Sequence, residues 1–217
     1  MPTELPRFTP QQAHSASEAG MLLIDLRRYE DFAAHHIPRS ISVAFSRKSL
    51  PERIATASPP RSPIILLSED KQIIDAAAAA LTTQDRNPLR GTMNADIQAW
   101  RSAGIPLVQL AQITVQTLWQ RLNRVGDIPT LIDVREPFEW DLGYIDGSLL
   151  ISLGEIWQRA ESLDPRKDII LICQEGLRST TAASILLHHK FPRVGNVAGG
   201  IGNWLDADYP TVRPRKR

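Results

Sequence analysis

The chain has 217 residues, of which 42% are hydrophobic, and its 25 Lys and Arg residues almost balance its 24 Asp and Glu residues. This length holds one large domain or two domains of about 100 residues. The balanced charge gives no reason to expect nucleic-acid or membrane binding, and no apolar run approaches the ~20 residues that span a bilayer.

The first half of the chain alternates strand-like and helix-like runs. An apolar run at residues 22–25 ends in Asp25 and predicts a buried strand, because it lacks polar alternation. A short helix is expected over residues 28–34. The run 64–67 predicts a second buried strand, and apolar residues at helical spacing predict a helix over 73–81. Alternation of this kind indicates an α/β fold with a mostly parallel central sheet.

The second half repeats the first in three blocks. Residues 22–41 resemble residues 130–149, residues 63–70 resemble 168–175, and residues 96–108 resemble 200–212. Repetition in the same order indicates a duplicated domain of about 105 residues. The sequence therefore predicts two three-layer α/β domains, residues 1–109 and residues 110–217, each with a mostly parallel sheet flanked by helices. Trp100 and Trp204 hold equivalent places and are expected to pack the two cores.

The only cysteine, Cys173, directly follows the predicted strand 169–172. Ligands of parallel sheets bind beyond the carboxyl ends of the strands, so this position favours chemistry. The segment after it leads into a helix predicted over 180–190, and turn N–H groups with a helix N-terminus stabilise a thiolate. The expected anion-binding loop is Gln174, Glu175, Gly176, Leu177, Arg178 and Ser179.

Each polar or flexible residue of this loop has an expected role. Gly176 supplies conformational freedom, Arg178 adds positive charge, and Ser179 with Thr180 is expected to cap the helix. Glu175 opposes anion binding unless its side chain faces solvent. The competing interpretation is a buried structural cysteine, and it is disfavoured because packing does not require the spacing C-x-x-G-x-R before a helix.

The second half resembles the rhodanese (sulfurtransferase) superfamily in the pieces LIDVREPFEWDLGYIDGSLLI, IILIC, CQEGLRS and NVAGGIGNW. The resemblance implies that Cys173 carries a sulfane sulfur as a persulfide held by the loop. A donor such as thiosulfate would load it, and cyanide, a thiol or a sulfur-acceptor protein would receive the sulfur. No cofactor or metal is implied. Related phosphatases have C-x5-R, whereas four residues separate Cys173 from Arg178 here, which favours sulfur over phosphate.

The first half has lost the corresponding loop. Ser68 stands at the cysteine position, Lys71 at the glycine position and Ile73 at the arginine position. A hydroxyl cannot carry sulfane sulfur, so residues 1–109 are expected to be catalytically silent and residues 110–217 to be catalytic.

Arg135 has two possible roles in the sequence. It could contact an anionic donor at the mouth of the pocket, or it could form a structural ion pair with Asp133. The first half keeps the same two residue types at Asp25 and Arg27, which favours the structural role.

One cysteine excludes an internal disulfide, and residues 1–12 lack a secretory signal, so a cytoplasmic address is expected. The predicted function is sulfur transfer from a small donor through a Cys173 persulfide. The alternative is a non-enzymatic module that senses sulfur or redox state, or binds a partner, through the same thiol.

Overall fold

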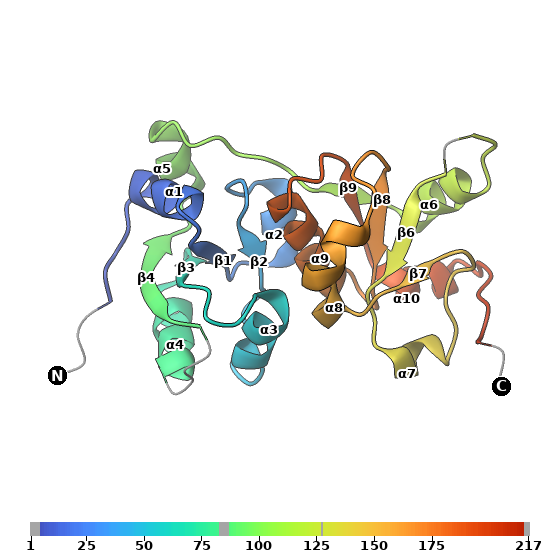
Figure 1. Ribbon diagram of the computed structural model, residues 1–217, viewed down its shortest axis with the longest axis horizontal. Helices are drawn as coiled ribbons and strands as arrows, with labels where there is room; N and C mark the ends of the chain where they lie inside the picture. Colours follow the sequence, from blue (N-terminus) through green and yellow to red (C-terminus); the bar gives the residue numbers. More distant parts are fainter. Residues whose placement is uncertain (1–4, 83–86, 127, 215–217) are drawn as a thin grey trace. The chain divides into compact units, whose positions relative to one another are not determined.

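The computed structural model describes residues 5–82, 87–126 and 128–214. The chain forms two compact units, Met1–Gln109 and Leu110–Arg217. Each unit has a parallel sheet with helices on both faces, so the predicted α/β fold class is confirmed (Figure 1). Within the described residues, no helix is both long and apolar enough to cross a bilayer.

Unit 1 is built on a four-stranded parallel sheet in the order β2-β1-β3-β4. Its strands are β1 (Leu22–Asp25), β2 (Ile41–Ser42), β3 (Ile64–Ser68) and β4 (Leu89–Asn94). Its helices are α1 (Pro10–Glu18), α2 (Tyr29–Ala34), α3 (Leu50–Ala57), α4 (Lys71–Thr82) and α5 (Ile97–Ser102). The burial of all residues of β1 and β3 explains why these strands read as unbroken apolar runs.

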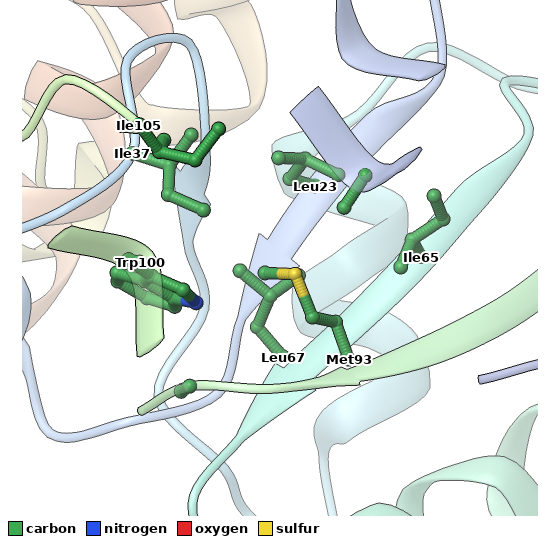
Figure 2. Close-up of a cluster of buried hydrophobic side chains, with 9 residues drawn as sticks. Leu23, Ile37, Ile65, Leu67, Met93, Trp100 and Ile105 are labelled. Atoms are coloured by element: carbon green, nitrogen blue, oxygen red, sulfur yellow. The ribbon is translucent and has the colours of Figure 1, made fainter. Parts of the chain in front are cut away.

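One core of unit 1 lies between the sheet and helices α1 and α5. Alternate residues of the strands point to this face, including Leu23 of β1 with Ile65 and Leu67 of β3. Trp100 of α5 is fully buried against them, as Figure 2 shows. The predicted core role of Trp100 is confirmed.

Unit 2 has a five-stranded parallel sheet in the order β5-β9-β8-β6-β7. Its strands are β5 (Ala111–Ile113), β6 (Thr130–Asp133), β7 (Leu149–Leu150), β8 (Ile169–Ile172) and β9 (Val194–Val197). Its helices are α6 (Val115–Leu122), α7 (Pro137–Trp140), α8 (Leu153–Arg159), the 3-10 turn η1 (Ala160–Ser162), α9 (Leu177–His188) and α10 (Gly200–Asp206). Trp204 of α10 is buried in the core on the α6 side of the sheet, as predicted.

The two units share one topology, strand for strand. The order β2-β1-β3-β4 recurs in unit 2 as β7-β6-β8-β9. Strand β5 pairs with β9 through Gln112 and Asn196, whereas among the described residues of unit 1 the corresponding edge has an isolated parallel bridge between Arg7 and Thr92. The repeat inferred from the sequence is therefore a structural duplication in which the edge strand of unit 1 is reduced.

Candidate active site

Cys173 lies at the carboxyl end of the central strand β8. Ile170 and Ile172 of this strand point into the core on the α6 and α10 side, so the alternation of the strand turns Cys173 toward the opposite face, where α9 packs. The cysteine is free and 1% exposed. Its position after β8 therefore brings the thiol against the start of α9.

Two hydrogen-bond donors reach the sulfur from the first turn of α9. The backbone N–H of Gly176 lies 3.1 Å from Cys173 Sγ, and Ser179 Oγ lies 3.2 Å from the same atom. The Ser179 hydroxyl also lies 3.2 Å from the carbonyl oxygen of Gly176. Since a hydroxyl has one proton, Ser179 can donate to either acceptor, and a negative charge on sulfur would draw that proton to Sγ.

Gly176 makes this turn possible. Its φ of 108° lies in the left-handed region, which a side chain would disfavour, and it is the N-cap residue of α9. The helix begins at Leu177 rather than at residue 180, so the prediction that Ser179 and Thr180 cap the helix was wrong. Both lie inside the first turn, and Thr180 Oγ1 donates to the Gly176 carbonyl at 2.8 Å. The early start is what places Ser179 beside the sulfur.

The N-terminus of α10 fixes the other side of the loop. The N–H of Ile201 donates to the Cys173 carbonyl at 2.8 Å, and the N–H of Gly202 donates to the Gln174 carbonyl at 3.1 Å. Because the described peptides are trans, the N–H groups of Gln174 and Glu175 point away from α10.

Close packing of the cysteine loop against the N-terminus of α10 requires a glycine at Gly200. A Cβ atom there would stand 2.3 Å from the Cys173 carbonyl oxygen. The sequence does not reveal this contact; Gly200 and Gly202 lie in the first turn of α10. The run of three glycines in GGIG was the only signal in the sequence.

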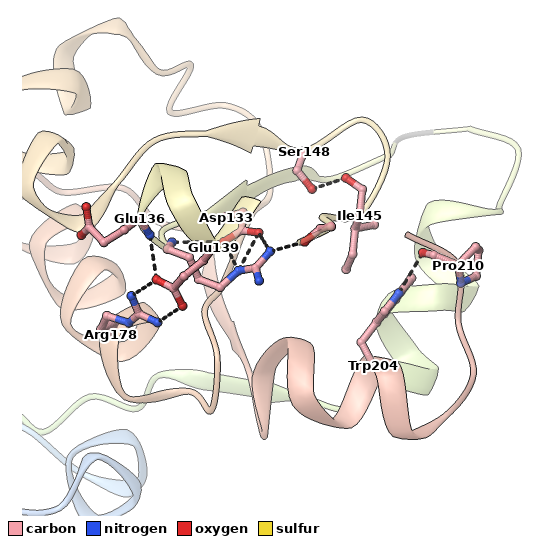
Figure 3. A network of polar contacts seen from close by, with 10 residues as sticks. Asp133, Glu136, Glu139, Ile145, Ser148, Arg178, Trp204 and Pro210 are labelled. Carbon is pink, nitrogen blue, oxygen red and sulfur yellow. Dashed lines mark hydrogen bonds and ion pairs between the residues drawn. The ribbon is translucent and has the colours of Figure 1, made fainter. Parts of the chain in front are cut away.

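Arg178 is held by Glu139 of α7 rather than left free beside the loop. Arg178 Nη1 and Nη2 donate to the two carboxylate oxygens of Glu139 at 2.6 and 2.7 Å, as Figure 3 shows. The hydrogen bonds from Arg178 hold the pKa of Glu139 below its usual value. The charge that was expected to serve the loop is therefore largely balanced within the protein. Gln174 and Glu175 are exposed, so the Glu175 carboxylate lies at the solvent side of the loop.

Arg135 is buried and clamps the turn that follows β6. Its Nε and Nη2 bind the Asp133 carboxylate, with the shortest contact at 2.7 Å, and Nη2 also donates to the Gly143 carbonyl at 2.8 Å. Unit 1 repeats the arrangement: Arg27 Nη2 binds Asp25 at 2.6 Å and the His35 carbonyl at 2.8 Å. This geometry is that of the structural alternative, and the donor contact of Arg135 stays a prediction.

In unit 1 the position of Cys173 is taken by Ser68, the last residue of β3. The Asp70 N–H donates to Ser68 Oγ at 3.1 Å, and the Asp70 carboxylate accepts from the Gln72 N–H at 2.7 Å. A carboxylate therefore occupies the N-terminus of α4, where unit 2 directs the Gly176 N–H to Cys173 Sγ. Helix α4 also begins at Lys71, three residues after Ser68, whereas α9 begins four residues after Cys173.

Comparisons with known proteins agree with the duplicated fold. Residues 9–103 and 114–207 each match the family described as "Rhodanese-like domain". The chain is similar to "Sulfurtransferase" of Allochromatium vinosum, with 32% identity over 103 residues that cover 48% of this chain and 95% of that protein. It is also similar to "Putative sulfur carrier protein YrkF" of Bacillus subtilis, with 32% identity over 95 residues. That match covers 44% of this chain and about half, 51%, of YrkF.

Among solved structures, the chain is similar to a rhodanese-related protein from Thermoplasma volcanium, with 31% identity and a TM-score of 0.44. The match covers 48% of this chain and 99% of that one.

Proposed function

The chain belongs to the rhodanese-like domain family, and from this premise we propose that unit 2 is a sulfurtransferase that carries sulfane sulfur as a persulfide on Cys173. The observation that carries the proposal is the pair of donors on Cys173 Sγ, the Gly176 N–H at 3.1 Å and the Ser179 hydroxyl at 3.2 Å. Both stabilise a thiolate, which is the nucleophilic form of cysteine. The name of the Allochromatium vinosum relative supports the same chemistry.

The first half-reaction loads the cysteine. The Cys173 thiolate attacks the outer sulfur of thiosulfate, a new S–S bond forms, and the bond to the sulfonate sulfur breaks with its electron pair, so that sulfite leaves. The persulfide then bears the negative charge that the thiolate brought. The same N–H and hydroxyl donors that face Sγ remain available to this charge.

The second half-reaction returns the thiolate. Cyanide or a thiolate attacks the outer sulfur of the persulfide, and the electron pair of the broken S–S bond returns to Cys173 Sγ. The chain has a single cysteine, so no second thiol of the same chain can capture the persulfide as a disulfide. The sulfur therefore goes to another molecule.

Unit 1 is proposed to have no sulfur-transfer activity. Ser68 offers a hydroxyl in place of a thiol, and the Asp70 carboxylate already caps α4. We expect that the double variant Cys173→Ser, Ser68→Cys is inactive, because the added thiol would sit beside that carboxylate in a shorter turn.

The alternative is a sensing module without turnover; the 1% exposure of Cys173 slows the reaction of the thiol in either function and so does not favour the sensor. Thiocyanate formation from thiosulfate and cyanide separates the two functions. An enzyme turns over many times per chain and loses turnover in Cys173→Ser, while Ser68→Ala retains it. A sensor gives at most one thiocyanate per chain.

A further inference from the structure

The two units differ in the segment that follows the Asp-x-Arg clamp. Residues 136–150 of unit 2 include α7 and contain no Lys or Arg. Their carboxylates are Glu136, Glu139, Asp141 and Asp146. The matching residues of unit 1, 28–42, carry both signs. Their charged side chains are Glu30, Asp31, Arg28 and Arg39. The acidic character thus belongs only to the unit that holds the cysteine.

The same segment exposes large apolar side chains in unit 2 alone. Phe138 is 70% exposed and Leu142 is 74% exposed. They are four residues apart, and the backbone at Asp141 continues the helical turn, so both lie on one side of α7. The matching positions of unit 1 hold Glu30 and Ala34. Unit 1 therefore shows that the fold does not need a large apolar residue at either position.

This surface, which we call the α7 face (Phe138, Asp141 and Leu142), lies on the segment that Glu139 ties to the cysteine loop. Glu139, the neighbour of Phe138, binds Arg178 through both carboxylate oxygens, and Arg178 lies in the first turn of α9 beside Ser179. The ion pair ties α7 to the turn that presents Cys173 (Figure 3). A protein seated on the α7 face would thus rest on the segment whose Glu139 holds the first turn of α9.

We propose that the α7 face docks the sulfur acceptor, a basic protein that presents a cysteine thiol beside an apolar side chain and Lys or Arg residues. This rests on the proposed function. The apolar pair supplies contact area, as Phe and other large side chains do at interface cores. The exposed carboxylate of Asp141 complements a cationic partner and attracts it over distance.

Docking makes the transfer step selective for an acceptor that is held in the complex. The thiolate of the acceptor attacks the outer sulfur of the Cys173 persulfide. The S–S bond to Cys173 breaks, its electron pair leaves on Cys173 Sγ, and the acceptor becomes the persulfide, so no oxidant or reductant is needed. Because Cys173 is 1% exposed, an acceptor positioned by the α7 face has an advantage over a free thiol.

The test uses the full chain and a helical peptide of Lys and Leu with one cysteine, beside a peptide in which Glu replaces every Lys. The variant Phe138→Glu, Leu142→Ala gives α7 the residues of unit 1. Val125→Glu is the matched control, because Val125 is 99% exposed outside the α7 face. Binding is measured by fluorescence anisotropy with the peptide cysteine changed to serine. Sulfur transfer is measured by mass spectrometry with the thiol peptide.

The proposal predicts that the wild type binds the Lys peptide at least tenfold more tightly than the Glu peptide, and that 0.5 M NaCl weakens the binding of the Lys peptide several-fold. The double α7 variant should bind the Lys peptide at least tenfold more weakly and transfer sulfur to it at least tenfold more slowly. The double variant should still load sulfur from thiosulfate and discharge it to cyanide as the wild type does. The Val125→Glu control should bind and transfer normally.

Equal binding of the Lys peptide by the wild type and the double variant would overturn the docking proposal while leaving sulfur transfer intact. Self-association of the chain that the double variant abolishes would assign the face to a second copy and also overturn it. Failure of the wild type to load any sulfur, with peptide binding that still depends on the α7 face, would instead refute the proposed function and its transfer step, and leave the docking surface supported.

Discussion

Glu139 and Arg178 join α7 to the start of α9 through two parallel hydrogen bonds of 2.6 and 2.7 Å. The Glu139 side chain is 15% exposed and that of Arg178 is 28% exposed. Such two-point pairing fixes the guanidinium in position as well as balancing its charge. It makes the first turn of α9, and so the donors on Cys173, depend on a residue of a different helix.

Changing Glu139 to Gln should lower the free energy of unfolding by about 1–2 kcal/mol, because Arg178 keeps its charge but loses a charged acceptor. Urea unfolding at pH 7 measures this loss. The pKa of Glu139 is lowered in the folded state from 4.5, so the stabilisation is present above pH 4.5 and is lost as the pH falls through the folded pKa. The wild type and the variant should therefore converge in stability at acid pH, and an equal gap at all pH values would contradict the role of the pair.

Arg135→Lys and Arg27→Lys form a matched pair that distinguishes a clamp from a donor contact. A lysine keeps the charge but cannot bind the Asp carboxylate and the turn carbonyl in the same way, so each variant should lose roughly 1–3 kcal/mol in urea unfolding. The clamp role predicts similar losses and an unchanged KM for thiosulfate in both. A KM that rises several-fold only in Arg135→Lys would show that Arg135 contacts the donor.

Ser179→Ala should lower the rate of persulfide formation by about tenfold to a hundredfold, since a hydrogen bond to a charged group contributes roughly 1.5–3 kcal/mol. Rapid-quench mass spectrometry with thiosulfate measures the rate. Ser184→Ala is the matched control, because it makes the same change in the same buried helix, where the hydroxyl donates to the Thr181 carbonyl at 2.7 Å. Equal rates in the two variants would rule out a role for the Ser179 hydroxyl.

His36 should make the stability of unit 1 depend on pH. Its ring stacks on Phe32 with centroids 3.9 Å apart, and burial lowers its pKa from 6.5 to about 4. The unfolded chain then binds a proton below pH 6.5 that the folded protein does not, so stability falls as the pH drops from 6.5 toward 4, by up to about 3 kcal/mol.

His36→Tyr removes this titration and installs the residue type found at the matching position, Tyr144. Thermal unfolding between pH 4 and pH 7 should show a weaker pH dependence in the variant. The same dependence in both proteins would mean that His36 does not titrate as its burial requires.

The strands and the duplication were predictable because they depend on local pattern. Every residue of β3 and β8 is buried, and a strand that is buried on both faces has an unbroken apolar sequence. Strands β2 and β7 have two residues each, which is too short to give a recognisable apolar run in the sequence. The cysteine position was predictable for the same reason as β8, since it follows the end of the strand.

The partners of the loop residues were not predictable, because they lie far away in sequence. Arg178 meets Glu139, which is 39 residues earlier, and the Cys173 carbonyl meets the N–H of Ile201. Spacing within CQEGLRS cannot reveal either contact. The cap of α9 was misjudged because Ser and Thr favour N-cap positions in general, whereas here the left-handed Gly176 begins the helix and the hydroxyls turn back toward Gly176 and Cys173.

Intact-mass measurement of the full chain after incubation with thiosulfate tests sulfur transfer through Cys173 most directly. The account predicts a gain of one sulfur atom per chain, located on the peptide that contains Cys173, removed by cyanide and absent from Cys173→Ser. A wild-type chain that gains no sulfur, or a Cys173→Ser variant that gains it equally, would contradict the account.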